Sequence, residues 1–311
     1  HRAVPPPLDG GRSGAGFPPA AEMICTLCPR RCGAERTETE GKGFCAMPAG
    51  IRVARAALHM WEEPPISGVN GSGTVFFSGC TLRCRYCQNG SISAGGFGKA
   101  ITAERLREIF EELIARGAHN INLVTPTHFL PWILPALEPK LPVPVVYNCG
   151  GYESVETLRQ LEGKVDIYLP DLKYADGELA GRLSAAPDYF PVAVAAIREM
   201  FRQTGPCVLE DGLLKRGVVI RHLVLPGQLD NTRRCIDWVA ENFQPGEVLF
   251  SLMSQYTPQP DAEGVLRRHV TRSEYRAAVA YMENCGITDG FTQERTAARA
   301  EYTPPFDLTG V

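Results

Sequence analysis

The chain has 311 residues, an apolar content of 44% and a formal net charge of -3. A chain of this length can bury one large core, and its small net charge gives no electrostatic reason to bind nucleic acid or an anionic membrane. No apolar run approaches the length of a transmembrane helix, so we expect a soluble protein without a membrane partner.

The cysteines indicate the redox environment. There are eleven, an odd number that suits a set of disulfides poorly, and the first residues contain no signal-peptide core. Seven of the eleven fall in two tight clusters, which in a reducing compartment indicates metal binding. We therefore expect a cytoplasmic protein working where oxygen is scarce.

The first residues are dense in proline and glycine and offer little to bury. We expect a disordered leader over residues 1–22, and Met23 is a candidate initiator because the sequence begins with His1. The rest is predicted to divide into a cysteine-rich metal-binding segment with a connector, a core domain and a tail, at residues 23–70, 71–290 and 291–311.

The first cluster has the spacing C-x2-C-x3-C-x12-C and comprises Cys25, Cys28, Cys32 and Cys45. Chance clustering or a redox dithiol would also explain it, but the ligand count and spacing favour a metal. Four thiolates suit zinc, whereas the Cys28-Pro29 step resembles ferredoxin loops. We favour a second [4Fe-4S] cluster over zinc. With all four irons ligated by protein, it would relay electrons or hold structure.

The connector that follows is apolar and interrupted by prolines. Residues 51–54 are predicted to form a short strand, and residues 62–66 an extended segment. Glu62 and Glu63 could be a paired acid/base site, but adjacent side chains diverge in an extended chain. We therefore expect both carboxylates to face solvent.

The second cluster has the spacing C-x3-C-x2-C and comprises Cys80, Cys84 and Cys87, directly after the apolar run at residues 74–77. Three soft thiolates on one short loop can hold three irons of a cubane cluster and leave the fourth without a protein ligand. A structural zinc site is the alternative, but it requires four ligands and no fourth follows nearby. The open iron suggests chemistry.

This loop resembles that of radical S-adenosylmethionine (SAM) enzymes, in which the amino and carboxylate groups of SAM chelate the open iron of a [4Fe-4S] cluster. Tyr86 before the last cysteine, and Gln88-Asn89 after it, fit the branch similar to pyruvate formate-lyase activating enzyme. The resemblance covers residues 23 to about 290. It implies that Tyr86 contributes to SAM binding.

The remainder alternates short β-rich runs with helical patterns, which predicts a parallel sheet covered by helices. The expected strands are residues 74–79, 120–125, 144–149, 165–172, 217–225 and 247–255, and the expected helices include 102–116, 188–201, 231–242 and 273–285. Six strand-helix units are too few for a complete eight-stranded barrel of about 250 residues. We predict an α/β fold with a partial (β/α)6 TIM-like barrel.

Functional groups of a parallel barrel gather at the carboxyl ends of its strands. The second strand is followed by Thr127 and His128, where most of the superfamily has a glycine-rich turn facing the SAM ammonium. The proline-containing turn with Thr127 could still present carbonyls there. His128 is either an acid or base, or a packing residue.

Asn148 ends the third strand where activating enzymes have an aspartate that contacts SAM, and Cys149 beside it is expected to be a buried, inert thiol.

The fourth strand ends in Asp171-Leu-Lys173, which matches the activating-enzyme pattern. Side chains two apart on a strand share a face, so Asp171 and Lys173 can both point into the barrel mouth. By resemblance, Lys173 pairs with the SAM carboxylate and Asp171 orients it or holds a cation; an exposed ion pair is the alternative. Arg221 is expected inside the barrel near SAM, with His222 facing the helices, and Gln255 ends the sixth strand near the adenosyl group.

The resemblance implies reductive cleavage of SAM to methionine and a 5'-deoxyadenosyl radical, with an electron from a low-potential donor such as flavodoxin or ferredoxin. The protein supplies orientation and water exclusion. A glycyl-radical enzyme is the expected target, and a small molecule or peptide is the alternative. A non-catalytic iron-sulfur protein would require the SAM-contacting pattern to be a coincidence.

Overall fold

A computed structural model describes residues 23–292 and 303–311. The predicted leader at residues 1–22, and residues 293–302 of the predicted tail, lie outside the described residues. Within the described parts, none of the helices is both long and apolar enough to cross a membrane.

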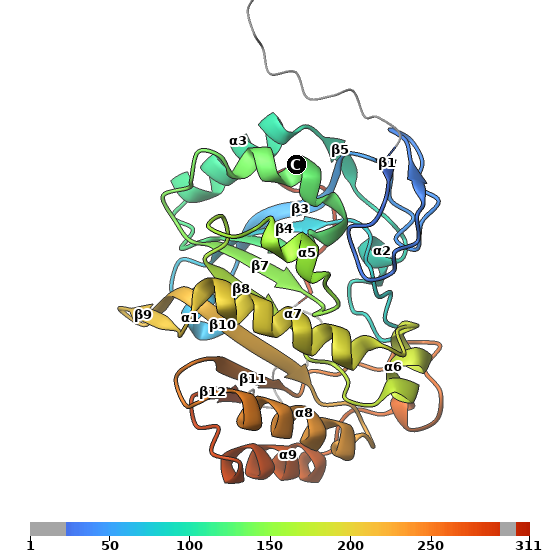
Figure 1. Cartoon of the computed structure of the whole chain (residues 1–311), viewed down its shortest axis with the longest axis vertical. Helices are drawn as coiled ribbons and strands as arrows, with labels where there is room; N and C mark the ends of the chain where they lie inside the picture. The colour runs from blue at the N-terminus through green and yellow to red at the C-terminus, as the bar shows by residue number, and fades with distance from the viewer. Residues whose placement is uncertain (1–22, 293–302) are drawn as a thin grey trace, which may run out of the picture.

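The core is a parallel sheet curved into a partial barrel, with its helices on the outside (Figure 1). The six predicted strands are present and lie side by side in chain order, as β4 (Ser72–Phe77), β6 (Ile121–Val124), β7 (Val145–Cys149), β8 (Ile167–Pro170), β10 (Leu213–Leu223) and β11 (Leu249–Met253). The prediction of a partial TIM-like barrel is therefore confirmed.

The four predicted helices are α3 (Ala103–Ala115), α7 (Tyr189–Thr204), α8 (Leu229–Asn242) and α9 (Arg272–Asn284). The sequence of α3 explains its position. Thr102 caps its first turn by accepting a hydrogen bond from the backbone N–H of Arg105, and its apolar face is buried. Gly117, with a φ of 92°, allows the chain to turn away after the last helical turn.

Further strands flank the barrel on both sides. β3 (Ile51–His59), predicted only as residues 51–54, pairs antiparallel with β4, and β5 (Lys99–Ile101) pairs antiparallel with β3. β12 (Gly290–Thr292) adds a short parallel strand beside β11. Among the described residues, the sheet runs from β5 to β12 and does not close into a ring.

Shorter elements connect these strands. They are β1 (Met23–Ile24), β2 (Glu35–Arg36), α2 (Gly90–Ser93), α4 (Leu130–Ile133), α5 (Val155–Arg159), α6 (Gly177–Ser184), β9 (Val208–Glu210) and three short 3-10 turns at Thr127–Phe129, Leu134–Leu137 and Gly264–Arg267. β1 and β2 form a separate antiparallel pair in the cysteine-rich segment.

The connector was predicted to be extended between residues 62 and 66, and this is wrong. Pro64–Ser67 form one helical turn, α1, with the prolines at its first positions, where their fixed φ suits a helix. Ile66 on this turn is fully buried against apolar residues of β7, β8, β10 and β11. The amide of Asn120, just before β6, donates to the Ile66 carbonyl at 2.8 Å. Thus α1 packs at the end of the barrel where the strands begin.

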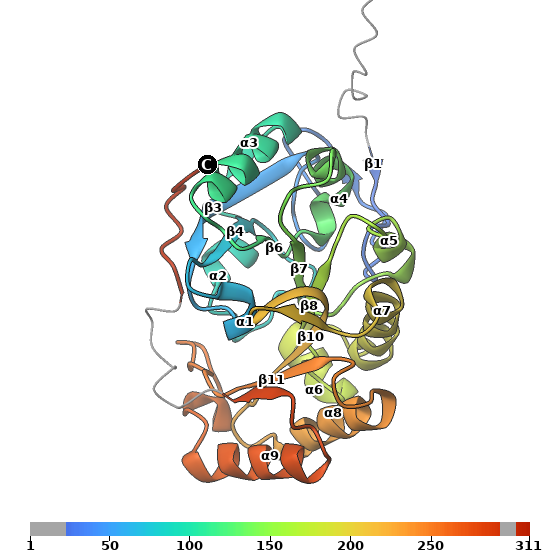
Figure 2. The same ribbon diagram turned by 90° about the vertical axis from the view of Figure 1, so that its left-hand side faces the viewer.

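The last described residues, 303–311, form a strap along β3, which Figure 2 shows beside the barrel. The backbone N–H of Ala56 donates to the Thr309 carbonyl at 2.9 Å, and that of Leu308 donates to the Ala54 carbonyl at 3.1 Å. The ring of Phe306 packs edge-on against that of Phe76 on β4, with centroids 5.4 Å apart. We call residues 303–311 the C-terminal strap.

Candidate active site

The loop of the second cysteine cluster leaves the end of β4 and runs into α2. Gly79 has a φ of 81°, and a Cβ there would meet the side chain of Met47 at 2.3 Å, so the tight exit from the strand needs glycine. Each thiol of the loop receives a hydrogen bond: from the Leu82 N–H to Cys80 at 3.4 Å, from Ser184 Oγ to Cys84 at 2.9 Å and from Ser93 Oγ to Cys87 at 3.4 Å.

The buried thiols of this loop suit the cationic core of an iron-sulfur cluster. Burial and the neighbouring thiol of Cys84 raise the pKa of Cys80 to about 12, and the same two causes raise the pKa of Cys87. Three thiolates held together therefore need a positively charged partner, which the irons of a cluster provide.

A charged network lies at the carboxyl ends of β8 and β10. Asp171 accepts a hydrogen bond from Lys173 Nζ at 2.6 Å and another from Arg221 Nε at 2.9 Å. Asn148 on β7 accepts from Arg221 Nη2 at 2.6 Å. All three charged side chains are largely buried, with exposed fractions of 14% to 17%. The prediction that Asp171 and Lys173 share the barrel mouth is confirmed, and an exposed surface pair is excluded.

The pKa directions follow from this packing. Burial alone would raise the pKa of Asp171, but Arg221 and Lys173 outweigh it and hold the pKa below its ordinary value. Burial opposes the charge of Lys173, yet Asp171 and Cys84 raise its pKa well above the usual range. Lys173 is therefore a permanent cation, and both the Asp171 carboxylate and Cys84 of the loop favour its charged form.

Glu62 and Glu63 were predicted to face solvent, and this is wrong. The helical turn α1 places both side chains inside the barrel, where they are less than 10% exposed. Glu62 accepts from the amides of Asn122 and Asn148 at 3.2 and 3.3 Å and from Arg221 Nη1 at 3.4 Å. Burial raises the pKa of Glu62, against the opposing effect of Arg221. Arg221 is thus shared by two carboxylates and one amide.

Two histidines lie close to the barrel strands, and His128 was the candidate acid or base. The ring of His128 is buried, with Nε2 2.6 Å from the Ser78 carbonyl oxygen, and burial lowers its pKa to about 3. His222 faces helix α8, as alternation predicted, with Nε2 2.9 Å from the Thr232 hydroxyl, and burial lowers its pKa to about 4. Both rings are neutral packing groups at neutral pH.

The side chain of Thr127 turns away from the charged network. Its hydroxyl donates to Glu153 at 2.8 Å, and the Tyr147 hydroxyl donates to the same carboxylate at 3.0 Å. Burial raises the pKa of Glu153 to about 7. Thr125, just before this turn, has a φ of 58°, a strained conformation for a β-branched residue. Because its hydroxyl is bound to Glu153, Thr127 could offer only its backbone carbonyl to a cofactor.

Tyr86 lies in a chain of hydroxyl groups that ends at the cluster loop. Its hydroxyl is 2.7 Å from that of Tyr174, which is 2.7 Å from Ser184 Oγ, the donor to Cys84. Neither Tyr174 nor Ser184 was predicted, because their contacts with the loop span 88 and 100 residues of sequence. Gln255 is partly buried near Met253, and its backbone carbonyl accepts from Gln88 Nε2 at 2.9 Å.

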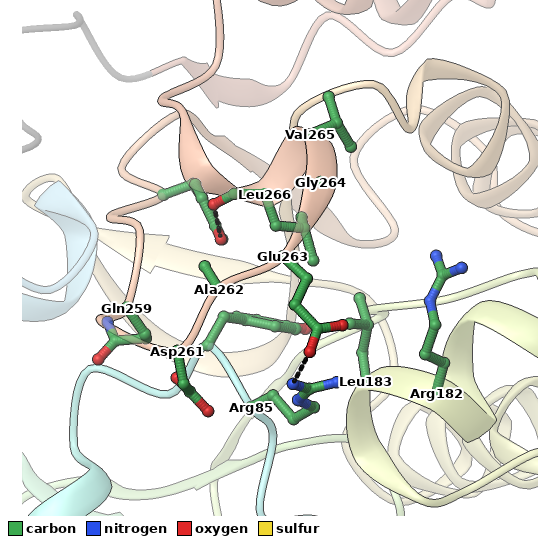
Figure 3. Close-up of a pocket in the computed structure, with 12 residues that line it drawn as sticks. Arg85, Arg182, Leu183, Gln259, Asp261, Ala262, Glu263, Gly264, Val265 and Leu266 are labelled. Atoms are coloured by element: carbon green, nitrogen blue, oxygen red, sulfur yellow. Dashed lines mark hydrogen bonds and ion pairs between the residues drawn. The ribbon is translucent and has the colours of Figure 1, made fainter.

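A pocket of about 370 Å³ is lined in part by Tyr86. Figure 3 shows its other walls. Arg85 and Arg182 line it together with the segment that follows β11, and Arg85 forms an ion pair with Glu263 at 3.5 Å. The pocket is thus next to the cluster loop, mixed in charge and partly aromatic. No sequence pattern pointed to it, since its wall comes from an irregular segment.

The first cysteine cluster packs next to the loop of the second cluster. Cys25 and Cys28 are buried, Cys45 is half-buried and Cys32 is exposed. Burial raises the pKa of Cys28 to about 12, and Glu153, Cys25 and Cys45 act in the same direction. Within residues 23–292 and 303–311, no three His, Cys, Asp or Glu side chains converge as one bare ion requires. In a cubane cluster each cysteine binds a different iron, so its ligands do not need to converge on one point. The absence of a single-ion site among these residues is therefore compatible with a cubane at either cysteine cluster.

Comparison with known proteins identifies the family. Residues 74–239, more than half of the chain, match the model of the Radical SAM superfamily. An uncharacterized protein of Methanocaldococcus jannaschii is 32% identical over 275 residues, covering 85% of this chain and 75% of the relative.

Among solved structures, SuiB of Streptococcus suis matches with a TM-score of 0.50 and 14% identity over 72% of this chain and 48% of its own, so this chain spans about half of SuiB. A domain of pyruvate-formate lyase-activating enzyme from Bacteroides vulgatus matches with a TM-score of 0.40 and 11% identity, over 53% of this chain and 91% of that domain. The match to SuiB shows a shared fold, and the match of the family model shows more: the chain belongs to the radical SAM superfamily.

Proposed function

We propose that this protein reductively cleaves SAM to methionine and a 5'-deoxyadenosyl radical, and that the radical abstracts hydrogen from a glycyl-radical enzyme. The superfamily implies a [4Fe-4S] cluster and SAM. Cys80, Cys84 and Cys87 would hold the cluster, which supplies the electron when reduced by a low-potential donor such as flavodoxin or ferredoxin. The observation that carries the proposal is the buried array of Asp171, Lys173 and Arg221 beside the cluster loop.

The array can bind the amino acid end of SAM. Lys173 offers a permanent cation to a carboxylate, and Asp171 fixes its direction through the 2.6 Å contact. Asn148 and Arg221 extend the polar wall with an amide and a guanidinium already held in place. Backbone carbonyls of the strained turn at Thr125 to Thr127 are candidates for the SAM ammonium. Tyr86 and Gln255 remain candidates for the adenosyl end.

The choice of target rests on two features. The Asp171-Leu-Lys173 pattern and the cluster loop resemble those of activating enzymes, which act on a glycine loop of a partner protein. A peptide or small molecule is the second candidate, favoured by the walled pocket of about 370 Å³ beside Tyr86. Its two arginines and its acidic residues could orient a polar substrate.

Anaerobic SAM cleavage tests the chemistry. The reconstituted protein, reduced with dithionite or flavodoxin, should form 5'-deoxyadenosine, and Cys84→Ser should form none above background. Cys285→Ser, a change at a half-buried cysteine outside both clusters, should retain activity. If Cys84→Ser still produces 5'-deoxyadenosine, the proposed site is wrong.

The target needs a separate assay. A glycyl-radical enzyme encoded beside this chain should acquire an EPR doublet when incubated with the reduced protein and SAM. Deuterium from its labelled glycine should appear in 5'-deoxyadenosine. SAM cleavage without either signal, but with label transferred from a peptide or small molecule, would select the second candidate.

A further inference from the structure

Arg36 is a buried cation without a carboxylate partner among the described residues. Its side chain is only 1% exposed, and its guanidinium donates to the carbonyl oxygens of Met47 at 3.1 Å, Pro48 at 2.7 Å and His128 at 2.5 Å. The guanidinium also lies over the ring of Trp132, 4.9 Å from its centroid. Carbonyl groups satisfy donors but bring no negative charge, so the buried positive charge still needs a counter-ion.

The nearest candidate anion is the first cysteine cluster. Nη1 of Arg36 lies 3.8 Å from Cys25 Sγ. Among the described residues, Arg36 is the one fully buried arginine or lysine, and it contacts a thiol of this cluster.

The backbone around these cysteines is shaped for close packing. Arg31 and Ala46 both adopt positive φ, at 41° and 54°, in turns closed by hydrogen bonds to the carbonyls of Cys28 and Gly43. A Cβ on Gly43 would lie 2.9 Å from Cys32 Sγ. Two strained turns and a glycine beside a thiol are expected where a loop wraps around a compact bound group.

We propose that Cys25, Cys28, Cys32 and Cys45 hold a second [4Fe-4S] cluster whose negative charge is balanced by Arg36. Four thiolates outweigh the positive charge of the iron-sulfur core, so the assembled centre is an anion. The proposal goes beyond SAM cleavage at the first cluster and does not depend on the identity of the target.

A second arginine ties this site to the SAM-cluster loop. Arg30, between Cys28 and Cys32, donates through Nε to the Thr81 carbonyl at 2.8 Å and through Nη2 to the Ser184 carbonyl at 2.9 Å. Its guanidinium also lies 3.8 Å from the centroid of the Phe44 ring, next to Cys45. Thr81 follows Cys80, and Ser184 donates to Cys84, so the two cysteine clusters share a wall.

Metal content tests the site. The anaerobically reconstituted protein should contain about eight irons and eight sulfides per chain, and alanine at Cys25, Cys28, Cys32 and Cys45 should remove about four of each. The triple variant with alanine at Cys80, Cys84 and Cys87 should keep the other four. Four irons with one zinc, or four irons alone in the wild type, would overturn the proposal. Eight irons without SAM cleavage would overturn the proposed function only.

The role of Arg36 is tested in the triple variant, whose EPR signal would come from the second cluster alone. Arg36→Gln should lower the midpoint potential of that cluster by at least about 59 mV. For a one-electron couple, this shift equals a tenfold change in the ratio of reduced to oxidised form. Arg36→Lys should stay close to the wild-type potential. Arg31→Gln, at a neighbouring side chain that is 70% exposed, is the matched control and should change nothing.

Two results would contradict this role. One is an Arg36→Gln potential equal to that of Arg31→Gln. The other is loss of the cluster from both Arg36→Gln and Arg36→Lys in proteins that remain folded, since that would assign Arg36 to packing alone. Loss from Arg36→Gln with retention in Arg36→Lys would support the charge-balancing role.

Discussion

The ammonium of Lys173 lies 2.6 Å from the carboxylate of Asp171, on the side of the barrel that faces the cluster loop. Cys84 of the cluster loop also acts to raise the pKa of Lys173. Asp171 therefore holds a cation in reach of the place where a cluster-bound amino acid would lie. The contact gives the site a fixed positive charge before any ligand arrives.

Asp171→Asn should weaken SAM binding and the fold together. It leaves two buried cations, on Lys173 and Arg221, without their shared carboxylate, and breaking a buried pair typically destabilises by about 3–5 kcal/mol. SAM affinity should fall at least about tenfold, because charge-assisted hydrogen bonds contribute roughly 1.5–3 kcal/mol. Anaerobic equilibrium dialysis and denaturant unfolding measure the two effects. Asp230→Asn, at a side chain that is 93% exposed, should change neither.

Glu62→Ala should act on SAM through Arg221. Removing this carboxylate frees one arm of the guanidinium and two amide donors, on Asn122 and Asn148. We expect the KM for SAM to rise by about tenfold, the equivalent of roughly 1.4 kcal/mol, with a smaller fall in kcat. Glu62→Gln, which keeps an acceptor, should lie between Glu62→Ala and the wild type. An unchanged KM in Glu62→Ala would show that Arg221 keeps its position without Glu62.

Glu153 should make stability depend on pH. Its pKa rises from 4.5 to about 7 on folding, so the folded state binds the proton more tightly than the unfolded state. The stabilisation is present below about pH 4.5 and is lost as the pH rises through 7, by about 3 kcal/mol at 1.36 kcal/mol per unit. Because His128 and His222, with lowered pKa values, add stability as the pH rises over the same range, the measurement is the difference between the wild type and Glu153→Gln. The melting temperature of the wild type relative to that of Glu153→Gln, measured anaerobically between pH 5 and 8, should fall as the pH rises.

Phe306→Ala should release the C-terminal strap from β3. Phe76 is in register with Val124, and Val124 with Asn148, so their side chains lie on the same face of the sheet. This is the inner face, because the side chain of Asn148 reaches Arg221 inside the barrel. The Phe306 ring, which contacts Phe76, therefore packs on the inner face of β4. Hydrogen exchange at the Ala56 amide should accelerate at least about tenfold if the strap contributes about 1.4 kcal/mol or more. Leu209→Ala, at an exposed residue of β9, is the control. Unchanged exchange would mean that the backbone hydrogen bonds and the contacts of Arg55 hold the strap without the Phe306 ring.

Local patterns predicted the parts of the site that lie on strands. Period-two alternation placed Asp171 and Lys173 together and separated Arg221 from His222, because a buried strand leaves each side chain only two directions. The six parallel strands followed from their β-rich runs for the same reason. The cysteine spacing identified the cluster loop because its ligands are close in sequence.

The parts of the site that could not be predicted depend on contacts between segments that are distant in sequence. Glu62 and Glu63 look solvent-facing in an extended chain, and only the turn at Pro64 directs them into the barrel. Ser184 has no pattern that marks it, since its contact with Cys84 spans 100 residues. The same is true of Arg36, whose burial depends on the carbonyl of His128, 92 residues away.

The strap has a consequence for the order of folding. Arg55 on β3 pairs with Asp307 across 252 residues, and its guanidinium also donates to the Pro305 carbonyl across 250. During synthesis, the strands can assemble in chain order while these partners are still in the ribosome. The side of the barrel beside β3 and β4 therefore stays uncovered by the strap until residues 305–307 have left the ribosome.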